Sequence, residues 1–369
     1  MTNLLFVEII KAAVGRRKSL SALPSEKQWY KLFELAQQQA IAGVCFAGVQ
    51  RQKELGVCPP TQLYYEWLAV AGMIQQQNEL LNQESAEICR LVADGGYKSC
   101  VLKGQAVASL YDEELRMLRQ SGDIDVWMLA LPKEVIAWGR GTGRIYYYDY
   151  HHADLDYFKE TEVELHYRPT LSRNLLRNAR LQRWFRLELD KLIVDSEDLG
   201  FAMPRADFNL ILTLNHNFWH LLYEGVGLRQ MMDLYFVLRS RTEITEITKI
   251  EKLLKYFMLL RFARACMWVM QEVFGLERQY MVCEPDERSG RFLLNEIMTA
   301  GNFGQHDPRL KRGGESNRLV LLRRWLKHTF RLFGQYPSDV LWTPIGVLRI
   351  SLWRRWHYMK DKQIKHDQK

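Results

Sequence analysis

The feature that most constrains the fold is a change in hydrophobic spacing after Gly95-Gly96. Residues 63–91 carry apolar side chains three and four positions apart, which is typical of helices. Residues 123–128 and 162–166 instead alternate polar and apolar side chains, which is typical of half-buried strands. From Ser172 onward the helical spacing returns. The chain is therefore expected to have an α+β fold, with a small mixed β-sheet flanked by N-terminal and C-terminal helical regions.

The same change divides the chain into four predicted regions. They are an N-terminal helical region (1–92), an α+β core (93–170), a helical domain that binds or covers the substrate (171–305) and a basic, aromatic-rich helical tail (306–369). Within the core, strands are predicted at 98–102, 123–128, 144–150 and 162–167. Outside it, the spacing predicts one long helix or two stacked ones over 63–91, and a single helix over 249–274.

Composition excludes wholesale disorder and places the positive charge in the tail. Of 369 residues, 47% are hydrophobic and 25% are charged, which is ordinary for a globular protein. Residues 301–369 contain 15 Lys and Arg against 5 Asp and Glu, whereas the whole chain has a net charge of +8. Weak contact with a polyanion or a membrane surface is therefore expected through residues 318–360. The tail also holds Trp325, Trp342, Trp353 and Trp356, and we favour packing of these rings on the protein body.

Cysteine usage and the lengths of the apolar runs favour a cytoplasmic protein. The six cysteines form no C-x-x-C pair, so reduced thiols are expected. The sequence contains no uncharged apolar run of about 18 residues, so no transmembrane helix is expected.

Two carboxylates at the start of an apolar strand are the strongest chemical signal. Asp123 and Asp125 lie two positions apart, so a strand projects both from one face, where they repel unless a cation lies between them. A hard divalent ion with oxygen ligands is the natural partner, and Glu164 could complete a three-carboxylate cradle for it. A bare D-x-D pair is often only an exposed strand end. Here Gly122 precedes the pair, and an upstream strand ends in Lys103-Gly104, where an ammonium and backbone N–H groups could meet phosphates.

The like charges of this pair also predict how it responds to substitution. Asp123→Ala/Asp125→Ala is expected to abolish Mg²⁺-dependent ATP binding, while the metal-free protein stays as stable or becomes more stable because a repulsion has been removed.

Several motifs together resemble the signature of a known family. They are Leu102-Lys103-Gly104, Tyr111, the run Arg119-Gln120-Ser121-Gly122-Asp123-Ile124-Asp125, and Glu164-Leu165-His166. This set resembles a bacterial nucleotidyltransferase-like family of the DNA polymerase β-type nucleotidyltransferase superfamily. A weaker likeness continues through His216, His220, residues 227–233 and residues 301–304. One departure is Gly104-Gln105, where the superfamily pattern has Gly-Ser or Gly-Gly; the Gln105 amide is expected to donate a hydrogen bond there instead.

The resemblance implies a metal-dependent nucleotidyltransferase. Such an enzyme transfers an NMP, here expected to be AMP, from a metal-bound NTP, expected to be ATP, to a hydroxyl or phosphate of an acceptor. The acceptor is not identified and can be a small molecule, a protein or RNA. Mg²⁺ or Mn²⁺ would be held by Asp123, Asp125 and Glu164. The nucleotide would be bound by Lys103, Gly104, Gln105, Arg119 and Gly122. His166, Arg168, Arg229 and Asp233 would surround the residues that hold the metal and the nucleotide.

Some alternatives stay open at the level of sequence. The chain can also be a non-catalytic nucleotide-binding scaffold of the same fold, or a basic adaptor that binds RNA or a membrane surface. Arg119 can contact a phosphate or brace the carboxylates. His151 and His152 are adjacent on a predicted strand, so they should point to opposite faces and share no ion. His216 and His220 lie one helical turn apart, and we expect a structural role that includes Asp233.

Overall fold

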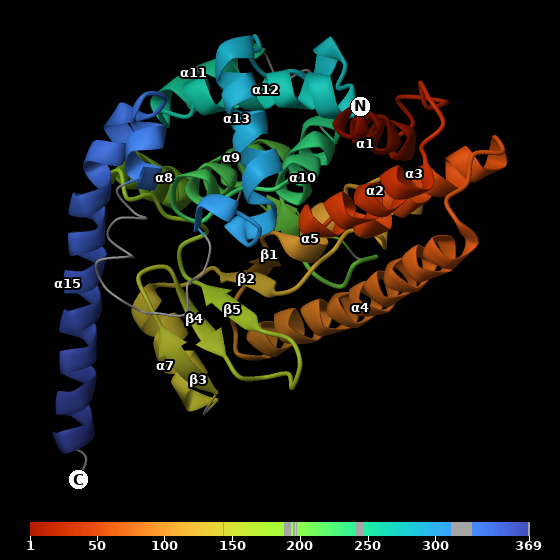
Figure 1. The fold of residues 1–369 in the computed structure, drawn as a ribbon. Helices are drawn as coiled ribbons and strands as arrows, with labels where there is room; N and C mark the ends of the chain where they lie inside the picture. The colour runs from red at the N-terminus through yellow and green to blue at the C-terminus, as the bar shows by residue number, and fades with distance from the viewer. Residues whose placement is uncertain are drawn as a thin grey trace.

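The architecture is the predicted α+β fold, with one small mixed sheet flanked by helices (Figure 1). The structure is a computed structural model that describes residues 1–142, 144–187, 193–194, 196, 198–240, 247–310 and 327–367. The five strands of the sheet lie in the order β1-β2-β5-β4-β3. β2 and β5 are parallel, and every other neighbouring pair is antiparallel.

The strands form where polar and apolar residues alternate. They are β1 (Ser99–Val101), β2 (Ile124–Met128), β3 (Ile145–Tyr148), β4 (His152–Leu155) and β5 (Val163–His166). A separate hairpin joins β6 (Ile193–Val194) to β7 (Met203–Pro204). The prediction of four core strands was wrong by one, because residues 144–167 hold three strands rather than two. β4 (His152–Leu155) follows β3 after a tight turn and lies between the strands predicted at 144–150 and 162–167.

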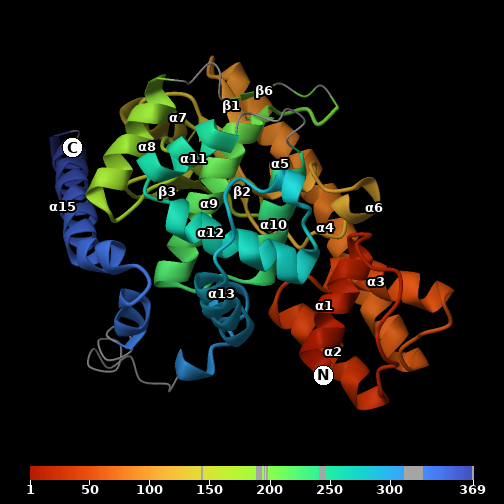
Figure 2. The same cartoon turned by 90° about the horizontal axis from the view of Figure 1, so that it is seen from above.

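Four helices precede the sheet. They are α1 (Thr2–Ala13), α2 (Glu26–Gln38), α3 (Ala42–Glu54) and α4 (Thr61–Asp94). α4 is one continuous helix of 34 residues, which decides between one helix and two stacked ones. Its first half packs in the same hydrophobic cluster as α1–α3, whereas Leu81, Ile88 and Val92 pack against the sheet. α4 therefore fixes the position of the sheet relative to the N-terminal helices (Figures 1 and 2).

Short helices connect the strands of the sheet. They are α5 (Gly104–Ala108), α6 (Glu113–Arg116) and α7 (Pro132–Gly141). The helices after the sheet are α8 (Leu175–Leu187), α9 (Ala206–Tyr223), α10 (Leu228–Arg239), α11 (Ile247–Tyr256), α12 (Leu260–Val269), α13 (Glu287–Ala300) and α15 (Pro337–Asp367). A π-helical turn (Met270–Phe274) extends α12.

The single helix predicted over 249–274 is broken, which corrects the sequence-based expectation. Met258 has a φ of 56°, so the chain turns between α11 and α12. The buried guanidinium of Arg177 donates hydrogen bonds of 2.9 Å to the carbonyl oxygens of Phe257 and Met258. The break is therefore stabilised by a side chain 80 residues away in the sequence, and no Gly or Pro marks it.

The division into four domains stays a prediction. The hydrophobic core shows that the N-terminal helices and the helices after the sheet share one cluster of buried residues. A single hydrophobic cluster contains Phe6 and Trp67 of the N-terminal helices together with Phe208 and Phe262 of the later ones. Trp127 of β2 also belongs to this cluster, whereas Val126 lies in the second cluster, under the sheet. β2 is thus buried on both faces.

The described part of the tail packs on the protein body. α15 lies along one side of the molecule, opposite α1–α3 (Figures 1 and 2). Asp339 forms a buried ion pair of 2.5 Å with Arg177, and the Trp353 ring packs edge-on against Tyr148 and Tyr150. This agrees with the packing expected for Trp353.

The structure describes only some of the other tail residues for which packing or ligand binding was predicted. Trp342 is half-buried, whereas Trp356 is 51% exposed. Trp325 and the cations Arg323 and Arg324 lie outside the described residues, so binding of RNA or of a membrane surface through 318–360 stays a prediction. Among the described residues, no helix combines the length and the apolar character needed to cross a membrane.

Candidate functional site

The sheet register brings three carboxylates into one row. Asp125 of β2 is the direct partner of Glu164 of β5, and Glu164 is the direct partner of Asp154 of β4. Residues directly opposite on neighbouring strands project from the same face. The next row along this face holds His166 and His152, which are also direct partners. Sequence reasoning placed Asp125 and Glu164 together but missed Asp154 and His152.

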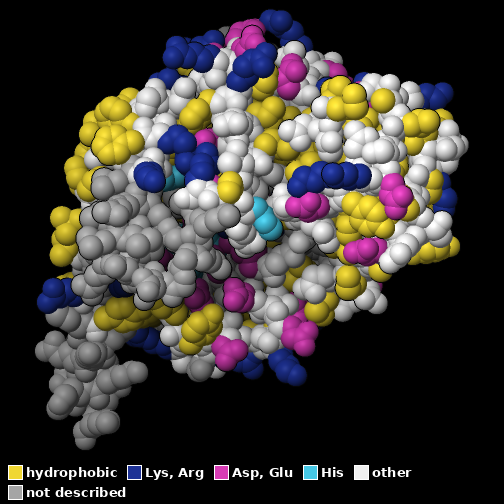
Figure 3. Space-filling view, viewed as in Figure 1, with side chains coloured by type: hydrophobic (Ala, Val, Ile, Leu, Met, Phe, Trp, Pro, Cys, Tyr) yellow, Lys and Arg dark blue, Asp and Glu magenta, His cyan; other side chains and the backbone are white. Residues whose placement is uncertain are grey.

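Asp125, Glu164, His166 and His152 line a cavity of about 390 Å³ between the sheet and α9–α10, whereas Asp154 does not line it. The sequence-predicted residues on its wall are Lys103, Gly104, Arg119, Asp123, Asp125, Glu164, His166, Arg229 and Asp233. In the space-filling view, acidic side chains and histidine gather at a hollow near the middle of this face (Figure 3). The structure therefore brings nine of the predicted residues to one cavity.

Two cations already lie among the carboxylates. Lys103 Nζ is 2.6 Å from Asp125 Oδ1. His166 Nε2 is 2.8 Å from the same oxygen and 3.1 Å from Glu164 Oε2. His166 thus contacts the carboxylates directly, although the resemblance implied only a surrounding position. The repulsion expected between carboxylates is relieved by side chains even without a metal ion.

Charges and burial shift the pKa of each group in a different direction. Burial alone would raise the pKa of Asp125, but Lys103 and the His166 hydrogen bond outweigh it and hold that pKa well below its usual range. Burial opposes ionisation of Glu164 as well, but its hydrogen bond with His166 lowers its pKa to about 2. The pKa of Asp123 is raised, chiefly by the negative charge of Asp125 and then by burial. Of these three carboxylates, Asp123 therefore has the negative charge that neighbouring cations compensate least in the metal-free protein.

His166 is expected to be a cation at neutral pH. Burial alone would lower its pKa, but the hydrogen bonds to Asp125 and Glu164 raise it to about 9. A histidine whose folded pKa exceeds its unfolded value of 6.5 stabilises the fold fully below pH 6.5, and this contribution is lost as the pH rises through about 9. The stability of the metal-free protein should therefore fall over this range, and this fall should be absent in His166→Asn.

Urea unfolding at pH 6.5 and pH 9.5 measures this difference directly, and NMR titration of ¹³C-labelled histidines gives the pKa itself. A parallel change of stability with pH in the two proteins would show that His166 is not protonated.

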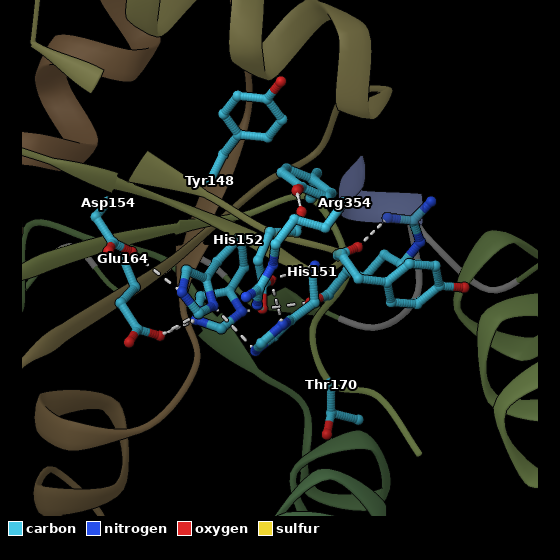
Figure 4. A network of polar contacts seen from close by, with 12 residues as sticks. Tyr148, His151, His152, Asp154, Glu164, Thr170 and Arg354 are labelled. Atoms are coloured by element: carbon cyan, nitrogen blue, oxygen red, sulfur yellow. Dashed lines mark hydrogen bonds and ion pairs between the residues drawn. The ribbon is translucent and has the colours of Figure 1, made fainter. Parts of the chain in front are cut away.

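A chain of imidazoles continues from the carboxylates along β4 (Figure 4). His152 Nδ1 lies 3.5 Å from Glu164 Oε2, and His152 Nε2 lies 3.1 Å from Asp154 Oδ1. His151 Nε2 lies 2.9 Å from His152 Nδ1, and His151 Nδ1 lies 2.9 Å from Asp149. The prediction that His151 and His152 point to opposite faces was wrong, because His151 precedes β4 and the strand alternation does not apply to it.

Arg119 is held by hydrogen bonds within the protein, as expected for a bracing residue, while a role in phosphate binding stays a prediction. Its guanidinium donates to both oxygens of Asp233 on α10, at 2.7 and 2.9 Å, and to Ser121 at 2.5 Å. The Tyr111 hydroxyl donates to the same Asp233 at 2.7 Å. The loop before β2 is thus tied to α10. Arg229, one turn before Asp233, donates to the carbonyl of Gln120 at 3.0 Å.

Gln105 and Arg168 lie away from the carboxylate cavity, which corrects their expected roles. The Gln105 amide is buried and donates to Asn82 of α4 at 2.6 Å, so its side chain does not face the Lys103-Gly104 turn. The Arg168 guanidinium stacks over the Tyr150 ring at 4.3 Å and lines a neighbouring cavity. Both side chains are held by partners that the motif spacing does not show.

The expected contact of the α9 histidines with Asp233 was also wrong. His216 and His220 contact each other, with 3.0 Å between their Nε2 atoms, and His220 also contacts Glu224 at 2.8 Å. Asp233 is already engaged by Arg119 and Tyr111.

Of the two glycines predicted to bind the nucleotide, only Gly104 lines the carboxylate cavity. Gly104 has a φ of 48°, and a Cβ there would lie 3.4 Å from the carbonyl oxygen of Asp123. A side chain at Gly104 would therefore be strained and would crowd the strand end. A Cβ at Gly122 would meet no atom within 4 Å, because Gly122 is exposed, and this residue does not line the cavity.

The donor set fits a hard divalent ion. Asp125, Glu164 and His166 offer ligand atoms that lie within 4.8 Å of one another. Two further groups, His151-His152-His166 and His152-Asp154-Glu164, meet the same spacing, whereas Asp123 lines the cavity but belongs to no such group among the described residues. Carboxylate oxygens are the preferred ligands of Mg²⁺, and an imidazole is tolerated by Mn²⁺.

A mixed sheet that carries this carboxylate row beside a Lys-Gly turn is consistent with a nucleotidyltransferase core. Residues 25–275 match a family described as uncharacterised nucleotidyltransferase. The match covers more than half of the chain, and the protein belongs to that family. The comparisons with curated proteins and with solved structures gave no match. Family membership confirms the resemblance and the predicted fold class.

Proposed function

We propose that the protein transfers an NMP, with AMP preferred, from a metal-bound NTP to an acceptor in the carboxylate cavity. An acceptor oxygen attacks the α-phosphorus, the bond from this phosphorus to the α–β bridging oxygen breaks, and pyrophosphate leaves. Mg²⁺ or Mn²⁺, when bound by Asp123, Asp125 and Glu164, would neutralise triphosphate charge and make the acceptor hydroxyl more acidic.

The residues of the chain have separate tasks in this reaction. Lys103, with an ammonium already at the carboxylates, is suited to compensate the charge of the triphosphate. Glu164 is half-buried and more open to the cavity than Asp125, so it is the better placed group to accept the acceptor proton. The absence of a side chain at Gly104, which lines the cavity, leaves room for the phosphates. Arg119, Tyr111 and Asp233 hold the loop that carries Asp123.

One observation carries the proposal. Asp125 and Glu164 are direct partners across parallel strands, and both line the cavity that also receives Lys103, Gly104 and Asp123. Lys103 and His166 compensate Asp125, whereas the raised pKa of Asp123 shows that its charge is poorly compensated, and a bound cation would supply that compensation.

A non-catalytic scaffold of the same fold is the second candidate, and a specific observation favours it. Lys103 and His166 already compensate Asp125, so a metal ion must displace or rearrange two cations before it binds. A protein that binds nucleotide without turnover is consistent with such a site.

Label transfer distinguishes the two candidates. The protein is incubated with Mg²⁺ and ATP labelled either at the α- or at the γ-phosphorus, together with pooled small molecules, RNA or protein acceptors. Nucleotidyl transfer predicts that the α-label enters the acceptor while the γ-label is released as pyrophosphate, and that Glu164→Gln lowers the rate at least about hundredfold. Binding of ATP without transfer of either label to any acceptor class would support the scaffold instead.

A further inference from the structure

A second cavity, of about 630 Å³, lies directly beside the carboxylate cavity. Trp127 lines it, whereas Asp125, two residues earlier on the same face of β2, lines the first cavity. Two residues along a strand span about 7 Å, so the cavities are neighbours along β2. Pro169 lines both. A molecule in the second cavity is thus within reach of the carboxylate row.

Three arginines from three parts of the fold meet in this cavity. They are Arg168 after β5, Arg186 on α8 and Arg349 on α15. Arg349 donates a hydrogen bond of 2.7 Å to the Tyr150 hydroxyl, and its guanidinium lies 5.0 Å from the centre of the Tyr150 ring. Arg168 lies over the same ring at 4.3 Å. The aromatic rings therefore hold two of the guanidiniums in place.

Positive charge exceeds negative charge in the lining of this cavity, which holds three arginines and the carboxylate of Glu134. None of the three arginines forms an ion pair with a described carboxylate. The lining carboxylate, Glu134, accepts a hydrogen bond from the backbone of Leu131 at 2.7 Å. Burial lowers the pKa of Arg168, and the nearby charges of Arg349 and Arg186 lower it further. A group of like charges held this way favours an anionic ligand.

The rest of the lining determines what the anion is attached to. Trp127, Tyr150, Tyr167 and Phe185 contribute aromatic surface, and the volume is within the range of about 300–1,000 Å³ that is usual for small-molecule sites. An RNA chain needs an open groove, whereas this cavity suits a compact molecule with a planar body.

We propose that this cavity binds the acceptor, and that the acceptor is a small organic anion with a phosphate or carboxylate group on a planar body. This inference rests on the proposed function, since an acceptor presupposes transfer. Arg349 belongs to α15, which lies beyond the matched residues 25–275, so the C-terminal helix gives this chain a selectivity that the family core alone does not supply.

The test is calorimetry of the full-length protein with phenyl phosphate, in EDTA and without nucleotide. Without metal the carboxylate cavity repels phosphate, so binding reports on the second cavity. Phenyl phosphate should bind more tightly than inorganic phosphate, and benzyl alcohol should not bind measurably. Arg349→Gln and Arg186→Gln should each weaken binding of phenyl phosphate about tenfold, because each removes a charged hydrogen-bond donor.

Arg355→Gln is the matched control, since Arg355 is an exposed arginine on the same helix and does not line the cavity. It should change the affinity less than about twofold. Equal losses in Arg349→Gln and Arg355→Gln, or no binding to the wild type, would overturn the proposal. Asp123→Asn should leave phenyl phosphate binding unchanged. A wild-type protein that binds phenyl phosphate but not Mg·ATP would contradict the proposed function and leave this anion site intact.

Discussion

Replacing Arg119 by leucine is expected to lower the free energy of unfolding by about 3–5 kcal/mol. The guanidinium makes two hydrogen bonds to Asp233, and both side chains are largely buried. Without Arg119, the Asp233 carboxylate stays buried with only the Tyr111 hydroxyl as a strong donor. The loss comes mainly from this uncompensated charge, since an intact buried pair contributes little net stability. Urea unfolding at pH 7.5 measures the effect.

Two controls separate the buried pair from a general loss of charge. Arg119→Leu/Asp233→Leu should be less destabilised than the sum of the single variants, because it leaves no unpaired charge. Arg291→Leu removes an arginine from an exposed helical pair with Glu287 and should cost less than about 1 kcal/mol. If Arg119→Leu were as mild as Arg291→Leu, the bracing role assigned to Arg119 would be wrong.

Asp123→Asn is expected to weaken Mg²⁺-dependent ATP binding at least about hundredfold, since loss of even an outer partner of a metal ligand costs about 10–100-fold. The metal-free variant should be as stable as the wild type or more stable above the pKa of Asp123. That pKa is raised, chiefly by Asp125, so the ionised carboxylate disfavours the folded state. The gain should disappear below about pH 4, where the carboxyl is protonated in the folded and the unfolded protein.

Asp123→Asn is a better test of metal binding than Asp123→Ala/Asp125→Ala, because Asp125 has two cationic partners in the metal-free protein. Sequence reasoning expected Asp123→Ala/Asp125→Ala to keep or raise stability, on the basis of repulsion alone. The structure removes that basis for Asp125, because Lys103 and His166 contact it at 2.6 and 2.8 Å. Substituting Asp125 leaves these cations without their partner, so the double variant should be less stable than Asp123→Asn.

The sequence predicts the parts of the site that depend on strand alternation. Period two places Asp125 and Glu164 on one face, and the Lys-Gly turn precedes a helix, as the structure shows. The resemblance to the family also predicted that Arg119 and Asp233 belong to the site, but it did not predict that they bind each other. These successes share a cause, because local spacing determines which face a side chain takes.

The missed parts depend on contacts between distant segments. His152-Ala153-Asp154-Leu155 alternates polar and apolar residues, and this signal could have revealed β4 and with it Asp154 and His152. No local signal shows that Gln105 turns towards Asn82 or that Arg349 reaches Tyr150, since these pairs join separate helices and strands. The break after α11 likewise depends on Arg177, which no spacing within 249–274 indicates.

The most direct test of the central claim is calorimetric titration of ATP into wild type and Asp123→Asn, each with Mg²⁺ and with EDTA. We expect ATP to bind the wild type only when Mg²⁺ is present, and its affinity to fall at least about hundredfold in Asp123→Asn. Circular dichroism should show that the variant remains folded. Equal ATP affinity in the two proteins, or equal affinity with and without Mg²⁺, would contradict the assignment of the carboxylate cavity as a metal–nucleotide site.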